Sequence, residues 1–161
     1  MIVDASVWVS YFIVEDTRHV ETVAWLDDML HSGRPMAVPT LVLPEVAGAV
    51  ARRSSRPDLG LRAAHQLLEY PFLDLVYPDR AITLLATRVA ATLPMKGADA
   101  IYVAVAKTLE RSLVTWDVEQ RTRGGGLLVS ARPPEENAFV EEFRKGYISP
   151  LDRKLKRPRR G

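Results

Sequence analysis

The stretch IVDASVWV, residues 2–9, joins a short apolar run to an acidic residue and then to a helical pattern. We predict a strand at residues 1–3 and a helix at residues 6–14, with Asp4 at the junction between them. The same order recurs along the chain, because short β-type runs alternate with longer stretches whose apolar residues have helical spacing. This alternation is typical of a parallel sheet that is covered by helices on both faces.

The predicted elements define the fold class. Helices are expected at residues 6–14, 20–31, 40–54, 58–70, 79–93 and 97–110. Strands are expected at residues 1–3, 36–39, 72–76, 112–115 and 127–130. We therefore predict an α/β fold, a three-layer α/β/α sandwich whose central, mainly parallel sheet has about five strands.

The chain has 161 residues, of which 47% are hydrophobic and 26% are charged. This length is enough to bury one core and too short for two ordinary domains. We predict one domain at residues 1–131, followed at residues 132–161 by a surface helix (residues 135–145) and a flexible basic tail. No apolar run approaches the ~20 residues that cross a bilayer, and the start of the chain lacks the features of a signal peptide. We expect a cytoplasmic protein that does not contact membranes.

The net charge of +2 conceals an uneven distribution. Eight lysines and arginines and one aspartate lie between residues 144 and 161, which leaves 14 basic and 19 acidic residues in the rest of the chain. The globular part is therefore acidic and would repel a polyanion unless local cations, a bound metal or the tail offset its charge. The tail is interpreted either as a solvated terminus, which we favour, or as an arm that binds nucleic acid.

Four acidic residues stand near the points where predicted strands pass into helices: Asp4, Glu45, Asp99 and Asp117. In an open parallel sheet ligands bind beyond the carboxyl ends of the strands, so we expect these side chains to meet there. Two carboxylates about 4 Å apart repel each other by roughly 4 kcal/mol at an effective dielectric constant of about 20. A hard divalent cation such as Mg²⁺ or Mn²⁺ would offset this repulsion and keep the oxygen ligands in place.

Each acid also has a purely structural interpretation when it is taken alone. Asp4 and Asp117 could cap the helices that follow them. Asp99 could complement the dipole of its own helix, and Glu45 could pair with an arginine further along its helix. We favour the metal site because the four acids form an ordered set at the ends of strands.

Four motifs along the chain belong together by their order and spacing. They are I-V-D-A-S-V-W-V at the start, P-E-V in the third helix, G-A-D-A-I-Y-V-A-V-A around Asp99 and L-V-T-W-D at the fourth strand. In this combination the chain resembles the PIN-domain ribonuclease family, and within it the VapC toxins of toxin–antitoxin pairs. The resemblance covers residues 1–129, and all four acidic positions of the family are filled.

The resemblance implies a metal-dependent endoribonuclease with the catalytic acids Asp4, Glu45, Asp99 and Asp117. Of these, the first, third and fourth would bind Mg²⁺ or Mn²⁺, and Glu45 would be a further ligand or would position water. Ser6 and Thr115 occupy the hydroxyl positions of the family and would orient carboxylates or bound water. The long basic extension and the bulky Trp116 depart from the family pattern; we expect Trp116 to pack within the fold or to stack on a base.

The resemblance also implies an RNA substrate, a homodimer and a small VapB-like antitoxin as a partner. Three cations are candidates for contacts with RNA phosphates: Arg52, Lys96 and Arg121. For Arg52 a solvated helix end is an equal alternative. The rival hypothesis for the whole protein is a catalytically inert PIN-like module that binds RNA or acts as a scaffold. Such a module is expected to lack one or more of the four acids, and none is missing.

Overall fold

The computed structural model describes residues 1–128 and 130–134, so the predicted helix at residues 135–145 and the basic tail lie outside the described residues. The strands of its sheet are β1 (Ile2–Val3), β2 (Met36–Pro39), β3 (Leu73–Val76), β4 (Leu113–Val114) and β5 (Ala131–Arg132). Neighbouring strands are parallel, and their order across the sheet is β3-β2-β1-β4-β5. The predicted parallel sheet of five strands is confirmed.

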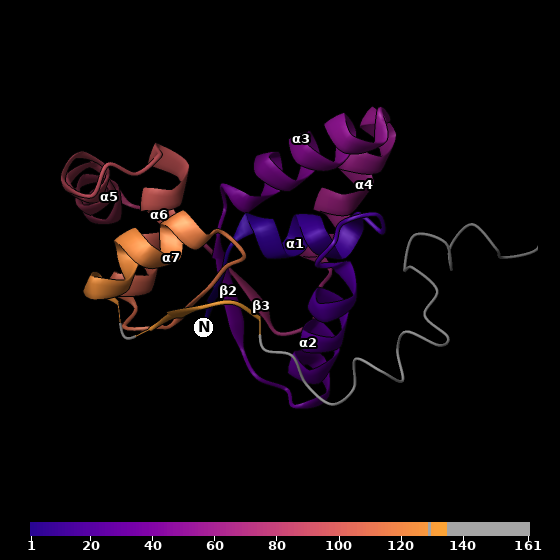
Figure 1. The fold of residues 1–161 in the computed structure, drawn as a ribbon, viewed down its shortest axis with the longest axis horizontal. Helices are drawn as coiled ribbons and strands as arrows, with labels where there is room; N and C mark the ends of the chain where they lie inside the picture. Colours follow the sequence, from indigo (N-terminus) through magenta and orange to yellow (C-terminus); the bar gives the residue numbers. More distant parts are fainter. Residues whose placement is uncertain (129, 135–161) are drawn as a thin grey trace, which may run out of the picture.

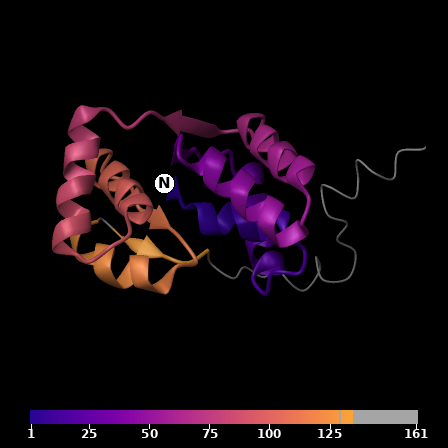
Figure 2. The same cartoon turned by 90° about the horizontal axis from the view of Figure 1, so that it is seen from above.

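Helices cover both faces of this sheet. They are α1 (Ala5–Phe12), α2 (His19–His31), α3 (Val42–Ser54), α4 (Pro57–Leu68), α5 (Arg80–Thr92), α6 (Gly97–Thr108) and α7 (Val118–Gly124), with a 3-10 helix η1 (Gly125–Leu127). Figure 1 shows α1 to α4 on one side of the sheet and α5 to α7 on the other, and the view in Figure 2 separates the same two groups. The predicted three-layer sandwich is therefore confirmed. Within the described residues, no helix combines the length and the apolar character needed to span a membrane.

Local sequence signals account for most of these elements. Strands β1, β2 and β4 are buried throughout, as expected for parallel strands that are covered on both faces. Three helices begin after an aspartate whose side chain accepts a backbone N–H of the first turn, namely Asp4 for α1, Asp79 for α5 and Asp117 for α7. Helix α4 packs closely against α3 at Gly60, which has no Cβ. A Cβ at this position would lie only 2.3 Å from the carbonyl oxygen of Ala47.

The prediction of a fifth strand at residues 127–130 is wrong. Gly125–Leu127 form a turn of 3-10 helix, and pairing with β4 begins where the N–H of Leu113 donates to the carbonyl of Ser130 at 2.9 Å. The two leucines that suggested a strand pack partly against the core instead. The paired residues of β5 are only half-buried because β5 is an edge strand, so an apolar pattern does not mark them.

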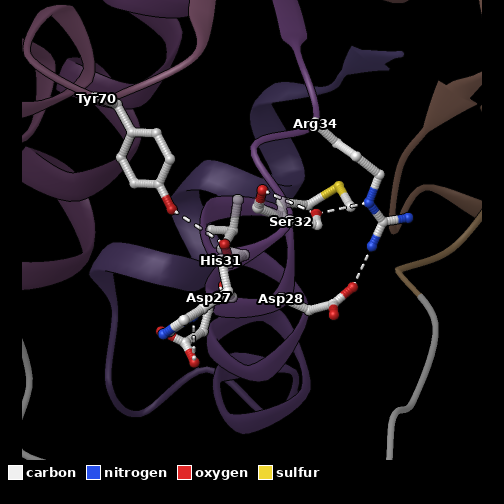
Figure 3. Close-up of polar contacts among 8 residues, drawn as sticks. Asp27, Asp28, His31, Ser32, Arg34 and Tyr70 are labelled. Atoms are coloured by element: carbon white, nitrogen blue, oxygen red, sulfur yellow. Dashed lines mark hydrogen bonds and ion pairs between the residues drawn. The ribbon is translucent and has the colours of Figure 1, made fainter.

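Helix α2 ends in a polar cluster that Figure 3 shows. Arg34, beyond the end of the helix, pairs with Asp28 and donates to Oγ of Ser32 at 2.7 Å. The hydroxyl of Tyr70 donates to the carbonyl of Leu26 at 3.4 Å. These contacts hold the turn that leads from α2 to β2 and connect the helix to the segment before β3.

Candidate active site

The strand order places a topological switch point between β1 and β4. The chain leaves β1 into α1 on one face of the sheet and leaves β4 into α7 on the other (Figure 1). In open α/β sheets a ligand crevice forms at such a point, outside the carboxyl ends of the strands. Asp4 follows β1 directly and Asp117 follows β4 closely, while Glu45 and Asp99 lie in the first turns of α3 and α6.

Asp4 is the most firmly held of the four acids. Only 5% of its surface is exposed. Its Oδ2 accepts the backbone N–H of Ser6 at 2.8 Å and the hydroxyl of Thr115 at 3.1 Å, and its Oδ1 accepts the amide N–H of Gln120 at 3.3 Å. A buried carboxylate is tolerated when it is hydrogen-bonded in this way. These three donors fix the orientation of the Asp4 carboxylate.

The two predicted hydroxyl residues connect the ends of β1 and β4. Because the Thr115 hydroxyl proton is donated to Asp4, the same oxygen is free to accept the Ser6 hydroxyl at 3.2 Å and the backbone N–H of Asp117 at 3.0 Å. Oγ of Ser6 in turn accepts the backbone N–H of Trp116 at 3.0 Å. Thr115 therefore bonds both to the Asp4 carboxylate and to the backbone of Asp117.

Glu45 has a partner that the sequence analysis missed. Its Oε2 accepts the hydroxyl of Tyr102 at 2.8 Å. Burial raises the pKa of Tyr102 well above its usual value, and the charges of Asp4 and Glu45 raise this pKa further, so Tyr102 remains a hydrogen-bond donor. Tyr102 lies one helical turn beyond Asp99 on α6, a spacing that the sequence shows without marking it as functional.

The pKa of Asp99 shows that the acids of the site influence one another. Its pKa is raised from 3.8 to about 6, first by burial and then by the charges of Asp4 and Asp117, while Lys96 lowers it. Burial also raises the pKa of Glu45; the Tyr102 hydrogen bond opposes this rise, and the charges of Asp4 and Asp99 add to it. Asp4 and Asp117 thus oppose the ionisation of Asp99, and Asp4 and Asp99 oppose that of Glu45.

Gln120 on α7 is a further residue that the sequence analysis did not single out. It is 1% exposed, and its amide group donates to Asp4 and, at 3.4 Å, to the backbone carbonyl of Asp99. It therefore connects the first β-strand with the start of α6. Only its helical spacing from Asp117 could have suggested it, and that spacing does not distinguish a site residue from a core residue.

The raised pKa of Asp99 predicts how the stability of the metal-free protein depends on pH. Because the folded-state pKa of about 6 exceeds the ordinary value of 3.8, the stabilising contribution of the protonated carboxyl is present below about pH 4 and is lost as the pH rises through about 6. After allowance for solvent screening, Asp99→Asn should increase the free energy of unfolding by about 1–2 kcal/mol near pH 7. Chemical denaturation in the presence of a chelator measures this gain, which should vanish near pH 4. A gain that is equal at both pH values would contradict the prediction.

The four acids have the donor atoms that a divalent cation needs, but their side chains are not arranged around one metal position. Their carboxylates supply only hard oxygen donors, which suit Mg²⁺ or Mn²⁺. Across residues 1–128 and 130–134, no three acidic or histidine side chains are arranged to hold a metal ion as they stand. The mutual repulsion that raises the pKa of Asp99 is nevertheless the repulsion that a cation would relieve.

Two cavities lie beside the acids, and each is lined by one of the three cations predicted to contact phosphates. A groove of about 540 Å³ is lined by Glu45, Asp117 and the exposed Arg52. A smaller cavity of about 230 Å³ is lined by Lys96 and Asp99. The contacts of these cations with RNA stay predictions.

Arg121 lines neither of these cavities. It donates to the carbonyl of Thr115 at 2.8 Å, which attaches α7 to the end of β4. Its contact with RNA stays a prediction.

The structural interpretations of the acids hold in part. Asp4 and Asp117 do cap α1 and α7, and each does so with one carboxylate oxygen. In contrast, Glu45 forms no ion pair with an arginine of its helix in the part of the chain that is described. Arg53 pairs instead with Asp16.

The family model for the PIN domain matches residues 1–125, so the chain belongs to the PIN-domain family. The predicted family is thereby confirmed. No curated protein matches the sequence.

Among solved structures, the chain is similar to Mycobacterium tuberculosis VapC20, a toxin that cleaves the sarcin-ricin loop, with 19% identity and a TM-score of 0.64 over 76% of this chain and 94% of that chain. PAE2754 from Pyrobaculum aerophilum has 18% identity and a TM-score of 0.62, covering 90% and 89% of the two chains. A toxin–antitoxin complex from Klebsiella pneumoniae has 18% identity and a TM-score of 0.58, covering 84% and 98%. These likenesses show a shared fold.

Proposed function

We propose that this protein is a metal-dependent endoribonuclease that hydrolyses RNA phosphodiester bonds and acts as the VapC-type toxin of a toxin–antitoxin pair. The observation that carries the proposal is the set of coupled acids at the switch point, where Asp4 and Asp117 raise the pKa of Asp99. Membership of the PIN-domain family and the fold shared with a VapC toxin support it.

The proposed cofactor is Mg²⁺ or Mn²⁺, held by Asp4, Asp99 and Asp117. When bound, such an ion supplies a water of lowered pKa and stabilises charge on the phosphoryl oxygens. Thr115 and Ser6 keep the carboxylate of Asp4 and the backbone of Asp117 in place through the hydrogen bonds described above. Glu45, with one oxygen held by Tyr102, keeps the other oxygen available to bind a ligand or to position the attacking water.

The proposed partners are RNA, a small VapB-like antitoxin and a second copy of the chain, in the cytoplasm. The fold shared with a toxin–antitoxin complex supports the antitoxin. We place the nuclease activity in residues 1–131 and treat residues 132–161 as an extension of it. The inert PIN-like module is the rival proposal, and the presence of all four acids argues against it.

The test is cleavage of RNA by the purified protein with Mg²⁺ or Mn²⁺ and with a chelator. Cleavage is expected only with the metal, because the acids alone offer no group that stabilises charge on the phosphoryl oxygens. The products should carry 5′-phosphate and 3′-hydroxyl ends, which end-labelling and sequencing of the fragments would identify. Cleavage that persists in the chelator, or no cleavage with either metal, would overturn the proposal.

A further inference from the structure

The groove beside the acids contains an arginine that the sequence analysis did not single out. Arg18 lies directly before α2, and its guanidinium carbon is 4.9 Å from the centroid of the Trp116 ring. Its side chain is exposed and lines the same groove as Glu45 and Asp117. A cation is therefore held on an aromatic ring within the cavity that the acids also line.

Trp116 forms a fixed platform for this arginine. Its indole N–H donates to Oγ1 of Thr22 at 2.8 Å, and its backbone N–H donates to Oγ of Ser6 at 3.0 Å. Trp116 also directly precedes Asp117, and both residues line the groove. Because Arg18 covers one face of the ring, that face is not open to a stacked base.

Asp16 holds the backbone of Arg18 in place. Its Oδ1 accepts the backbone N–H of Arg18 at 3.0 Å and the hydroxyl of Ser10 at 3.2 Å, and its other oxygen pairs with Arg53. Burial alone would raise the pKa of Asp16, but these hydrogen bonds outweigh burial and lower the pKa. Asp16 therefore stays ionised and offsets the charge of Arg53, while the guanidinium of Arg18 remains over Trp116.

The groove is lined by three arginines and three acids. Among residues 1–128 and 130–134, the salt bridges include Arg53 but neither Arg18 nor Arg52. A guanidinium that stacks on an aromatic ring keeps its N–H groups at its edge, where they can form two parallel hydrogen bonds with a phosphate. Stacking also restricts the side chain before the ligand arrives, which lowers the entropic cost of binding.

We propose that Arg18, held on Trp116, binds a phosphate of the RNA strand beside the bond that is cleaved, with Arg52 as a second cation of the same groove. This inference rests on the proposed nuclease function and identifies residues of the same site that bind the substrate. Residues 1–143 contain more acidic than basic residues, so a polyanion needs local cations at the point of entry. The groove supplies them next to Glu45 and Asp117.

The experiment measures binding of a short, fluorescently labelled single-stranded RNA at several salt concentrations, with a chelator present to prevent cleavage. The full chain carrying Asp99→Asn is the parent, because loss of one acid reduces repulsion of RNA. Adding Arg18→Ala should weaken binding about tenfold and reduce the slope of log Kd against log salt concentration by about 0.7. Arg18→Lys should keep the slope but bind less tightly, since it loses the planar fork. Arg34→Ala, at the end of α2 and outside the groove, is the matched control and should match the parent.

Equal affinity and equal salt slope for Arg18→Ala and Arg34→Ala would overturn the inference, as would the absence of RNA binding by the parent at low salt. Thermal melting of each variant shows that the exposed substitutions leave the fold intact. Metal-dependent cleavage by the wild-type chain is measured separately. If the wild-type chain does not cleave RNA but Arg18→Ala weakens binding, only the proposed function is contradicted. If the wild-type chain cleaves RNA but Arg18→Ala binds as tightly as the parent, only the present inference is contradicted.

Discussion

Asp99→Asn should lower metal-dependent RNA cleavage by more than about 100-fold, beyond the 10–100-fold typical of outer-shell partners of a metal. Asparagine keeps the size of the side chain but removes the charge that the cation would neutralise. Asp99 is the acid whose pKa rises to about 6, first because it is buried and then because Asp4 and Asp117 lie near it. Initial rates of cleavage with Mg²⁺ and with Mn²⁺ measure the effect.

Asp58→Asn is the matched control for this prediction. Asp58 is also an acid in the first turn of a helix, but it is exposed at the start of α4 and pairs with Arg56 at 2.7 Å. Its loss should leave the cleavage rate unchanged, because it lies outside both cavities. Normal cleavage by Asp99→Asn would refute the assignment of the four acids as the catalytic set.

Trp8→Ala should destabilise the fold by about 3–5 kcal/mol, the usual cost of removing a large aromatic side chain from a core. Trp8 has no exposed surface. Its ring packs edge-on against Tyr70, with centroids 5.0 Å apart, and against Tyr11 at 6.4 Å. Because Trp8 lies one turn after Asp4 on α1, the same packing also holds the helix that Asp4 caps. Urea denaturation measures the free energy of unfolding.

Trp8→Phe tests whether packing of the ring is what stabilises the fold. The indole nitrogen of Trp8 is buried and has no hydrogen-bond partner in the part of the chain that is described. Phenylalanine therefore removes no hydrogen bond and leaves a smaller void, so its cost should be clearly lower than that of alanine. Equal losses for the two variants would show that packing of the ring is not what stabilises this helix.

The sequence was informative where the signal was local. The alternation of short apolar runs with amphipathic stretches predicted the parallel sheet, four of its five strands and helices α1 to α6 to within two residues of their ends. No bounds were predicted for the short helices α7 and η1. The junction of β1 with α1 placed Asp4, because a capping aspartate after a buried strand is visible in the sequence itself. Edge strand β5 was misplaced because its half-buried residues carry no apolar signature.

The site was harder to complete from the sequence. Tyr102 and Gln120 form hydrogen bonds with Glu45 and Asp4. In the sequence, however, no pattern distinguishes them from other helical residues. Arg121 lies near Asp117 in the sequence, but its side chain bonds to a backbone carbonyl rather than entering a cavity. Nearness along the chain does not determine the direction in which a side chain points.

The sequence by itself determined the layered fold and the four acidic positions, because apolar periodicity, helix caps and the parallel order of strands are properties of short segments. Only the tertiary structure decided how strongly the acids oppose one another and which cations share their groove. Arg18 contacts Trp116 because the start of α2 lies beside the end of β4. The pKa of Asp99 is raised because the fold buries this residue and also brings it near Asp4. Such effects depend on distances between segments that are remote in the chain, and no local pattern encodes those distances.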